Sequence, residues 1–197
     1  ERWLHRIDVC LPSVRVGSPL RDKYNGSVSK TRPSASRPED RNVLLLQYGG
    51  ITGDMAGLSV NMYENFIDTV RELQKLGYTN IRFKMHPGPD KWRKSYFEKI
   101  ARYFDISCQI LKSEPFEECL KWADIVIGPV QTGALFETLA AGKPYHAFML
   151  PPHKIDLSYF EGFPVLSSLD QLSEAMNDNI EDAARKLLDD LYSIEEI

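Results

Sequence analysis

The stretch that decides the fold is residues 123–149, which read ADIVIGPVQTGALFETLAAGKPYHAFM. An apolar run, Asp124–Gly128, leads into a glycine-containing loop and then into helical spacing of apolar residues over Thr132–Ala141. Gly142 follows as a helix end, and Pro144–Met149 is a second apolar run. Short apolar runs between turn residues are typical of strands buried on both faces. The stretch therefore predicts a strand, a helix and a second strand of a parallel sheet.

The same alternation extends outward from this stretch. Apolar runs predict further strands, and amphipathic segments between them predict helices, of which the first would be capped by Ser59. The expected strands are 43–46, 81–85 and 108–111, and the expected helices are 59–76, 91–103, 115–122, 169–176 and 180–191. We therefore expect an α/β fold, a Rossmann-like doubly wound parallel sheet with helices on both faces.

Composition divides the chain and excludes some functions. Residues 1–41 contain many Ser, Pro, Gly and Arg residues with little apolar periodicity, which predicts an N-terminal segment and a flexible connector. Residues 42–197 would form the folded domain. The formal net charge of −4 argues against a nucleic-acid-binding surface. The first residue is not Met, which suggests that the sequence begins inside a longer chain.

Targeting and metal signals are weak in this sequence. No apolar run approaches the ~20 residues that a membrane span needs, and the N-terminus lacks the pattern of a signal peptide. The three cysteines, Cys10, Cys108 and Cys119, have no metal-type spacing with histidine. We therefore expect reduced thiols, no metal and a cytoplasmic protein.

Polar residues follow the first expected strand, where an open parallel sheet binds its ligands. The order is Gln47-Tyr48-Gly49-Gly50, and paired glycines allow a ligand to approach the backbone closely. Gln47 or Tyr48 can donate a hydrogen bond from the strand tip. The spacing is not that of a dinucleotide fingerprint, and a plain glycine-rich turn is the alternative. Asp54 could act as a base, although a lone acid in a polar loop is more often only solvated.

A histidine follows the second expected strand. His86-Pro87 comes directly after Lys84-Met85, and the proline forces the chain out of regular strand pairing. An imidazole at this edge can bond a phosphate oxygen or protonate it as it leaves. The alternative is a structural turn histidine. Lys84 and Arg82 share one face of the strand, and they supply positive charge to a site only if that face is open.

The third group of candidates lies in the stretch quoted first. Gly128, Pro129, Gln131, Thr132 and Gly133 lead into a helix amino terminus, where unpaired N–H groups and the helix dipole attract anions. Glu137 lies about one turn into that helix, where a carboxylate can accept both hydroxyls of a ribose. The alternative is a simple helix cap with a solvated glutamate.

These residues resemble a known family. The run from Ala123 to Pro144 looks like the nucleotide-sugar site of GT-B glycosyltransferases, in which a Gly/Ser/Thr turn opens a helix whose Glu holds the ribose. His86-Pro87 resembles the His-Pro motif of bacterial sialyltransferases, and with Gln47-Tyr48-Gly49 it looks still more like the bacterial β-Kdo transferases. Sialyltransferases usually have paired serines where this chain has Gln131-Thr132.

The resemblance implies a glycosyltransferase, the C-terminal half of a GT-B enzyme. It would transfer an acidic sugar, Kdo or sialic acid, from a CMP-sugar to a bacterial surface glycan such as capsule or lipopolysaccharide. His86 would be catalytic, and His86, Thr132 and the N–H groups after Gln131 would stabilise charge on the leaving phosphate. The implied partners are a nucleotide sugar, a glycan acceptor and a missing N-terminal domain that binds the acceptor. The resemblance implies no cofactor and no metal. It also implies a cytoplasmic enzyme, which could associate peripherally with the inner face of the cytoplasmic membrane.

Three other functions remain open on the sequence. A GT-B transferase that uses a UDP-sugar would need the same nucleotide site. A nucleotide-sugar epimerase shares the fold but needs acids that face the sugar from both domains. The third is a non-catalytic nucleotide-binding or assembly domain within a larger polymerase.

Overall fold

The computed structural model describes residues 37–47, 56–86, 93–150 and 156–192. Their centre is a six-stranded, fully parallel sheet with the strand order β3-β2-β1-β4-β5-β6. The strands are β1 Asn42–Leu46, β2 Asn80–Lys84, β3 Gln109–Leu111, β4 Ile125–Pro129, β5 Tyr145–Phe148 and β6 Val165–Leu166. The order reverses between β1 and β4, and this reversal is where doubly wound folds bind ligands.

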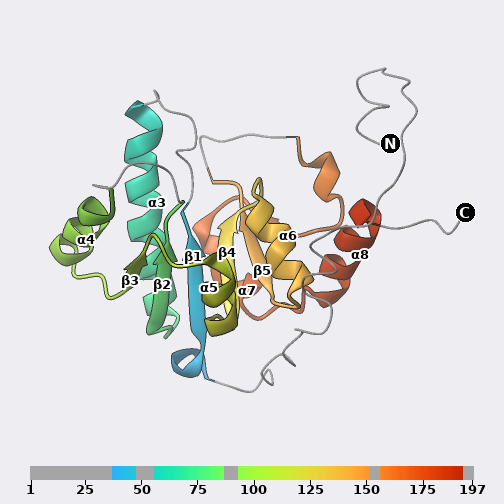
Figure 1. Ribbon diagram of the computed structural model, residues 1–197, viewed down its shortest axis with the longest axis horizontal. Coiled ribbons are helices and arrows are strands. Elements are labelled where there is room, and N and C mark those ends of the chain that lie inside the picture. Colours follow the sequence, from blue (N-terminus) through green and yellow to red (C-terminus); the bar gives the residue numbers. More distant parts are fainter. Residues whose placement is uncertain (1–36, 48–55, 87–92, 151–155, 193–197) are drawn as a thin grey trace, which may run out of the picture.

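Helices cover both faces of this sheet (Figure 1). The α-helices are α3 Ala56–Lys75, α4 Arg93–Tyr103, α5 Phe116–Trp122, α6 Gly133–Ala140, α7 Leu172–Ala175 and α8 Glu181–Tyr192. Three short 3-10 helices are η1 Pro38–Asp40, η2 Leu157–Phe160 and η3 Leu169–Gln171. No helix of the described residues is long and apolar enough to cross a membrane.

Strand alternation divides the core into two layers. Val43 and Leu45 of β1 pack on one face with α3, α4 and α7, whereas Leu44 and Leu46 pack on the other face with α5, α6 and α8. Successive side chains of a strand point to opposite faces, so nearly continuous apolar strands bury both. This arrangement confirms the predicted Rossmann-like doubly wound fold.

Most element boundaries lie within a few residues of the sequence-based expectation, and the expected helix 169–176 is divided into η3 and α7. The helix α3 begins at Ala56, so Ser59 lies inside it and the prediction that Ser59 caps this helix is wrong. The sixth strand, β6, was not predicted, because two residues are too short to show strand periodicity. By contrast, Gly77 and Gly142 have positive φ values of 90° and 67° directly after α3 and α6, as expected for glycines that end helices.

The last residues of the expected connector contact the sheet domain. Residues Pro38–Asp40 form η1, and the carbonyl oxygen of Glu39 accepts a hydrogen bond from Asn80 Nδ2 at 2.9 Å. Residues 1–36 lie outside the described part of the chain, so the expected flexibility of the connector stays a prediction there.

Candidate functional site

The carboxyl edge of the sheet brings most of the candidate residues to one side of the molecule. Gln47 directly follows β1, His86 follows β2 by one residue, and Pro129 ends β4. Gly133 begins α6, three residues beyond Val130. Because all strands are parallel, these positions share one edge, at and beside the reversal of strand order.

Gln47 fixes the ends of β1 and β2 to each other. Its Oε1 accepts a hydrogen bond from the backbone N–H of His86 at 3.0 Å, and its own backbone N–H donates to the Lys84 carbonyl at 2.9 Å. Its Nε2 faces the sulfur of Met62 on α3 at 3.1 Å, and the side chain is 9% exposed. Gln47 is therefore engaged within the protein, and its amide oxygen fixes the backbone of His86.

His86 has the opposite character. Its backbone is held by Gln47, whereas its side chain is exposed at the carboxyl edge. An exposed imidazole on a fixed backbone position is available to a ligand that binds over the ends of β1 and β2.

Gly128 is required by packing. A Cβ atom at this position would lie 2.5 Å from the Tyr145 hydroxyl oxygen and 2.9 Å from Leu46 Cβ. The Tyr145 hydroxyl occupies this space in order to donate to the Pro129 carbonyl at 2.8 Å. Burial raises the pKa of Tyr145 well above its usual value, so the hydroxyl remains a donor. Tyr145 thus fixes the start of the loop that leads to α6.

Tyr145 is a residue that the sequence analysis missed. A tyrosine in an apolar strand gives no signal of its own in a single sequence, because it fits the core as well as phenylalanine does. Only the pairing of β4 with β5, which aligns Val126 with Tyr145, brings the hydroxyl under the loop.

The amino terminus of α6 offers an anion-binding geometry. Thr132 caps the helix, since its hydroxyl accepts from the Ala134 N–H at 3.3 Å, and the Thr132 N–H donates to the Val130 carbonyl. The Gly133 N–H has no protein partner among the described residues. A Cβ added to Gly133 would meet nothing within 4 Å, so a ligand has room to approach this backbone.

Two further candidates flank this terminus. Gln131 is exposed in the loop, and Glu137 is half-buried one turn into α6. The structure thus brings Gln131, Thr132, Gly133 and Glu137 together along the first turns of one helix, at the edge where the strand order reverses.

The cations of β2 do not serve this edge as open charges. Lys84 is 8% exposed, and its Nζ donates to the Lys112 carbonyl at 2.6 Å, which ties β2 to the segment after β3. Burial lowers the pKa of Lys84. Arg82 lies two residues earlier and stacks over the Trp122 ring, with its Cζ 3.9 Å from the ring centroid. The face that these residues share is covered by α5.

Four of the predicted site residues, Tyr48, Gly49, Gly50 and Pro87, lie outside the described residues. Asp54 lies outside them as well. Their roles stay predictions.

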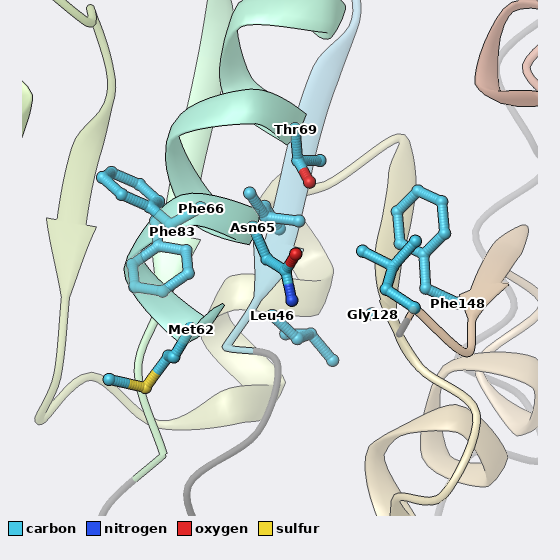
Figure 2. A pocket seen from close by; sticks show the side chains of 10 residues that line it. Leu46, Met62, Asn65, Phe66, Thr69, Phe83, Gly128 and Phe148 are labelled. Atoms are coloured by element: carbon cyan, nitrogen blue, oxygen red, sulfur yellow. The ribbon is translucent and has the colours of Figure 1, made fainter. Parts of the chain in front are cut away.

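A small pocket opens beside this edge, between α3 and the sheet (Figure 2). Its volume is about 10 Å³. Residues of four strands, β1, β2, β4 and β5, and one side of α3 line it, through Leu45, Leu46, Met62, Asn65, Phe66, Thr69, Phe83, Gly128, Phe148 and Leu150. The lining is apolar apart from Asn65 and Thr69, and no motif in the sequence indicates this pocket.

Comparison with known proteins finds similarity to solved structures. No protein-family model matches the chain, and no curated protein matches it. The chain is similar to a solved structure described as S. aureus MnaA with UDP, at 17% sequence identity and a TM-score of 0.44. The match covers 89% of this chain and 45% of that chain, so this chain spans less than half of that structure. The doubly wound fold itself rests on the strand order and the helices on both faces.

Proposed function

We propose that residues 42–197 form the donor-binding half of a GT-B glycosyltransferase. The enzyme would transfer an acidic sugar, Kdo or sialic acid, from its CMP conjugate to a bacterial surface glycan. The observation that carries this proposal is the amino terminus of α6, where the unpaired N–H of Gly133 has open space before it and Glu137 follows one turn later.

The α6 terminus supplies what a nucleoside monophosphate requires. The helix dipole and the Gly133 N–H favour a phosphate, and the Thr132 hydroxyl lies beside them. From one turn away, the Glu137 carboxylate would accept hydrogen bonds from the ribose hydroxyls. The nucleoside therefore extends along α6, and the phosphate lies at its first turn.

His86 would support the leaving group. When the bond between sugar and phosphate breaks, negative charge builds on the phosphate oxygens, and a preorganised donor lowers the barrier. The exposed imidazole of His86, on a backbone fixed by Gln47, is such a donor, and it can also deliver a proton. The resemblance of His86-Pro87 to the His-Pro motif supports cytidine as the base.

The rest of the reaction lies beyond the described residues. We propose that an N-terminal domain of the same polypeptide binds the glycan acceptor and activates its hydroxyl. No metal and no organic cofactor are needed for the roles assigned above. We place the enzyme in the cytoplasm, either free or at the inner face of the cytoplasmic membrane.

Calorimetric titration of the chain with CMP, 2′-deoxy-CMP, UDP and ADP tests this proposal. We expect CMP to bind most tightly, and we expect loss of the 2′-hydroxyl to weaken binding about tenfold, because it removes one hydrogen bond to a carboxylate. The variant Glu137→Gln should reduce this preference for the ribonucleotide. Glu72→Gln, on the last turns of α3, is the matched control and should retain it.

The other outcomes separate the alternatives. Tighter binding of UDP than of CMP would favour a UDP-sugar transferase or an epimerase. Binding of CMP without dependence on Glu137 would contradict the ribose contact. Binding of none of the four nucleotides would contradict a nucleotide-sugar site in this chain.

A further inference from the structure

Asn65 places a polar group in the small pocket at the strand ends. Its side chain extends from α3 into the space between Leu46 and Gly128 (Figure 2). The Nδ2 atom is buried and has no hydrogen-bond partner among the described residues. Buried side-chain donors in native proteins nearly always have a partner, so an orphan donor indicates a missing acceptor.

The orphan donor works against the stability of the fold. Asparagine is a poor helix former, and α3 carries Asn65 in its interior. The unpaired, buried Nδ2 atom adds the cost of its lost hydration, although the residue as a whole is half-buried. An apolar side chain of the same shape would avoid both costs, so this position resembles the local violations that are expected at functional sites.

The size of the pocket limits what can reach Asn65. A volume of about 10 Å³ has room for one water-sized group. The missing acceptor is therefore a single oxygen, either that of a water or that of a ligand that inserts one hydroxyl or carboxylate oxygen. Thr69, 2% exposed, supplies the second polar side chain of the lining.

The pocket lies on the far side of the sheet edge from the proposed nucleoside contacts. Asn65 belongs to α3, which packs on one face, whereas Glu137 belongs to α6, on the other face. With the ribose at Glu137 and the phosphate at the first turn of α6, the chain of contacts continues over β4 and β1 toward α3. The group beyond the phosphate on that side is the transferred sugar.

We propose that Asn65 Nδ2 donates a hydrogen bond to an oxygen of the transferred sugar and thereby selects which nucleotide sugar binds. This inference rests on the proposed function. It assigns Asn65 to the sugar and not to the nucleotide, and a test can therefore separate the two.

The test compares each nucleotide with its sugar conjugate, in the wild-type chain and in Asn65→Leu. The probes are CMP with CMP-sialic acid, and UDP with UDP-N-acetylglucosamine. We expect the wild-type chain to bind one conjugate more tightly than its bare nucleotide. Asn65→Leu should leave binding of the bare nucleotide unchanged and reduce this gain about tenfold, as for one hydrogen bond. Its melting temperature without ligand should not fall, since the variant removes an unpaired donor.

Two more variants guard this test. Asn65→Ser keeps a small polar group and replaces Asn65→Leu if that variant does not fold. Gln74→Leu, further along the same helix and outside the pocket lining, is the matched control and should keep the full gain. Leakage of the effect into Gln74→Leu would assign it to general changes in α3 and would overturn the proposal.

The remaining results are decisive in the same way. An unchanged gain in Asn65→Leu would show that Asn65 does not bind the sugar, and the proposal would be wrong. Equal weakening of the bare nucleotide and its conjugate would move Asn65 to the nucleotide and would also overturn it. A wild-type chain that binds neither nucleotide would remove the proposed function, and the role of Asn65 with it.

Discussion

The two edges of the sheet carry similar polar residues, but the hydrogen bonding of these residues differs between the edges. At the amino edge the polar groups are paired within the chain. Asp124 Oδ2 accepts from the Asn42 N–H at 2.9 Å, Asn42 Nδ2 donates to the Trp122 carbonyl at 3.0 Å, and Lys143 Nζ donates to the Ala123 carbonyl at 2.9 Å. The first two bonds tie β1 to the residue before β4 and to the last residue of α5, and the third ties the segment after α6 to the segment after α5.

At the carboxyl edge several groups lack such partners. The Gly133 N–H and Asn65 Nδ2 have no hydrogen-bond partner among the described residues, and the His86 side chain is exposed. Residue type therefore does not separate a structural group from a binding group. What separates them is whether the chain itself supplies the hydrogen-bond partner. The three groups named above lie at and beside the reversal of strand order.

This comparison can be tested by substitutions at either edge, ordered here by their expected effect on the free energy of unfolding. The largest effect concerns His146 of β5, which is 5% exposed. Burial lowers the pKa of His146 to about 4 from its ordinary value of 6.5; nearby Asp178 acts against this shift, and Arg41, directly before β1, adds to it.

The pH dependence follows from this lowered pKa. Between about pH 6.5 and pH 4 the unfolded chain binds a proton at His146 and the folded chain does not, so stability falls as the pH falls through this window. The expected loss is about 3 kcal/mol. Urea unfolding of His146→Leu at a series of pH values should show a shallower decline. His86→Leu, at an exposed position of the carboxyl edge, is the control, and an equal decline in His146→Leu and the wild type would refute the assignment.

The next prediction compares the effects on stability of alanine at two glycines, Gly128 of β4 and Gly133 of α6, which flank one loop. Gly128→Ala should lower the free energy of unfolding by about 2–3 kcal/mol, because the new methyl group meets the Tyr145 hydroxyl and Leu46 Cβ. Gly133→Ala should change it by less than about 0.5 kcal/mol, because its surroundings are open. Nucleotide affinity should instead fall in Gly133→Ala, where the methyl group obstructs the approach of a phosphate.

Chemical denaturation and calorimetry on the two variants measure both quantities. The double variant Gly128→Ala with Tyr145→Phe removes the closer of the two contacts and should recover part of the lost stability. Equal destabilisation by the two alanines would mean that Gly133 is packed and does not face a ligand.

The sequence predicted the architecture well, for physical reasons. A strand buried on both faces, such as Ile125–Pro129, requires an apolar run, and a helix end such as Gly142 requires a residue that tolerates positive φ. These constraints are local, so they are visible in a single sequence. The same locality explains why the start of a helix was expected at Thr132, which caps α6.

The site was only partly predictable, because its details depend on pairs distant in sequence. The space that excludes a Cβ at Gly128 is filled by Tyr145, and Gln47 reaches Met62 and His86 through neighbouring elements. Asn65 resembles any polar helix residue until the packing of α3 shows that its amide has no partner. Residue types and strand ends thus indicate where a candidate site lies. The contacts of each residue become visible only in the fold.

A small effect on stability is expected at His86, and it accompanies the largest effect on function. His86→Ala removes an exposed side chain while the backbone bond to Gln47 remains, so the free energy of unfolding should fall by less than about 1 kcal/mol. In the polypeptide that carries both halves of the transferase, kcat should fall about 100-fold or more, since a donor to the leaving phosphate is lost.

Asp124→Ala, at the opposite edge, is the matched control. It leaves the Asn42 N–H without its acceptor, which should cost about 1–2 kcal/mol of stability and leave kcat unchanged. Thermal unfolding and turnover are measured on both variants. A His86→Ala enzyme that is destabilised but retains its turnover, beside an Asp124→Ala enzyme with reduced turnover, would reverse the contrast between the edges and make His86 a structural turn residue.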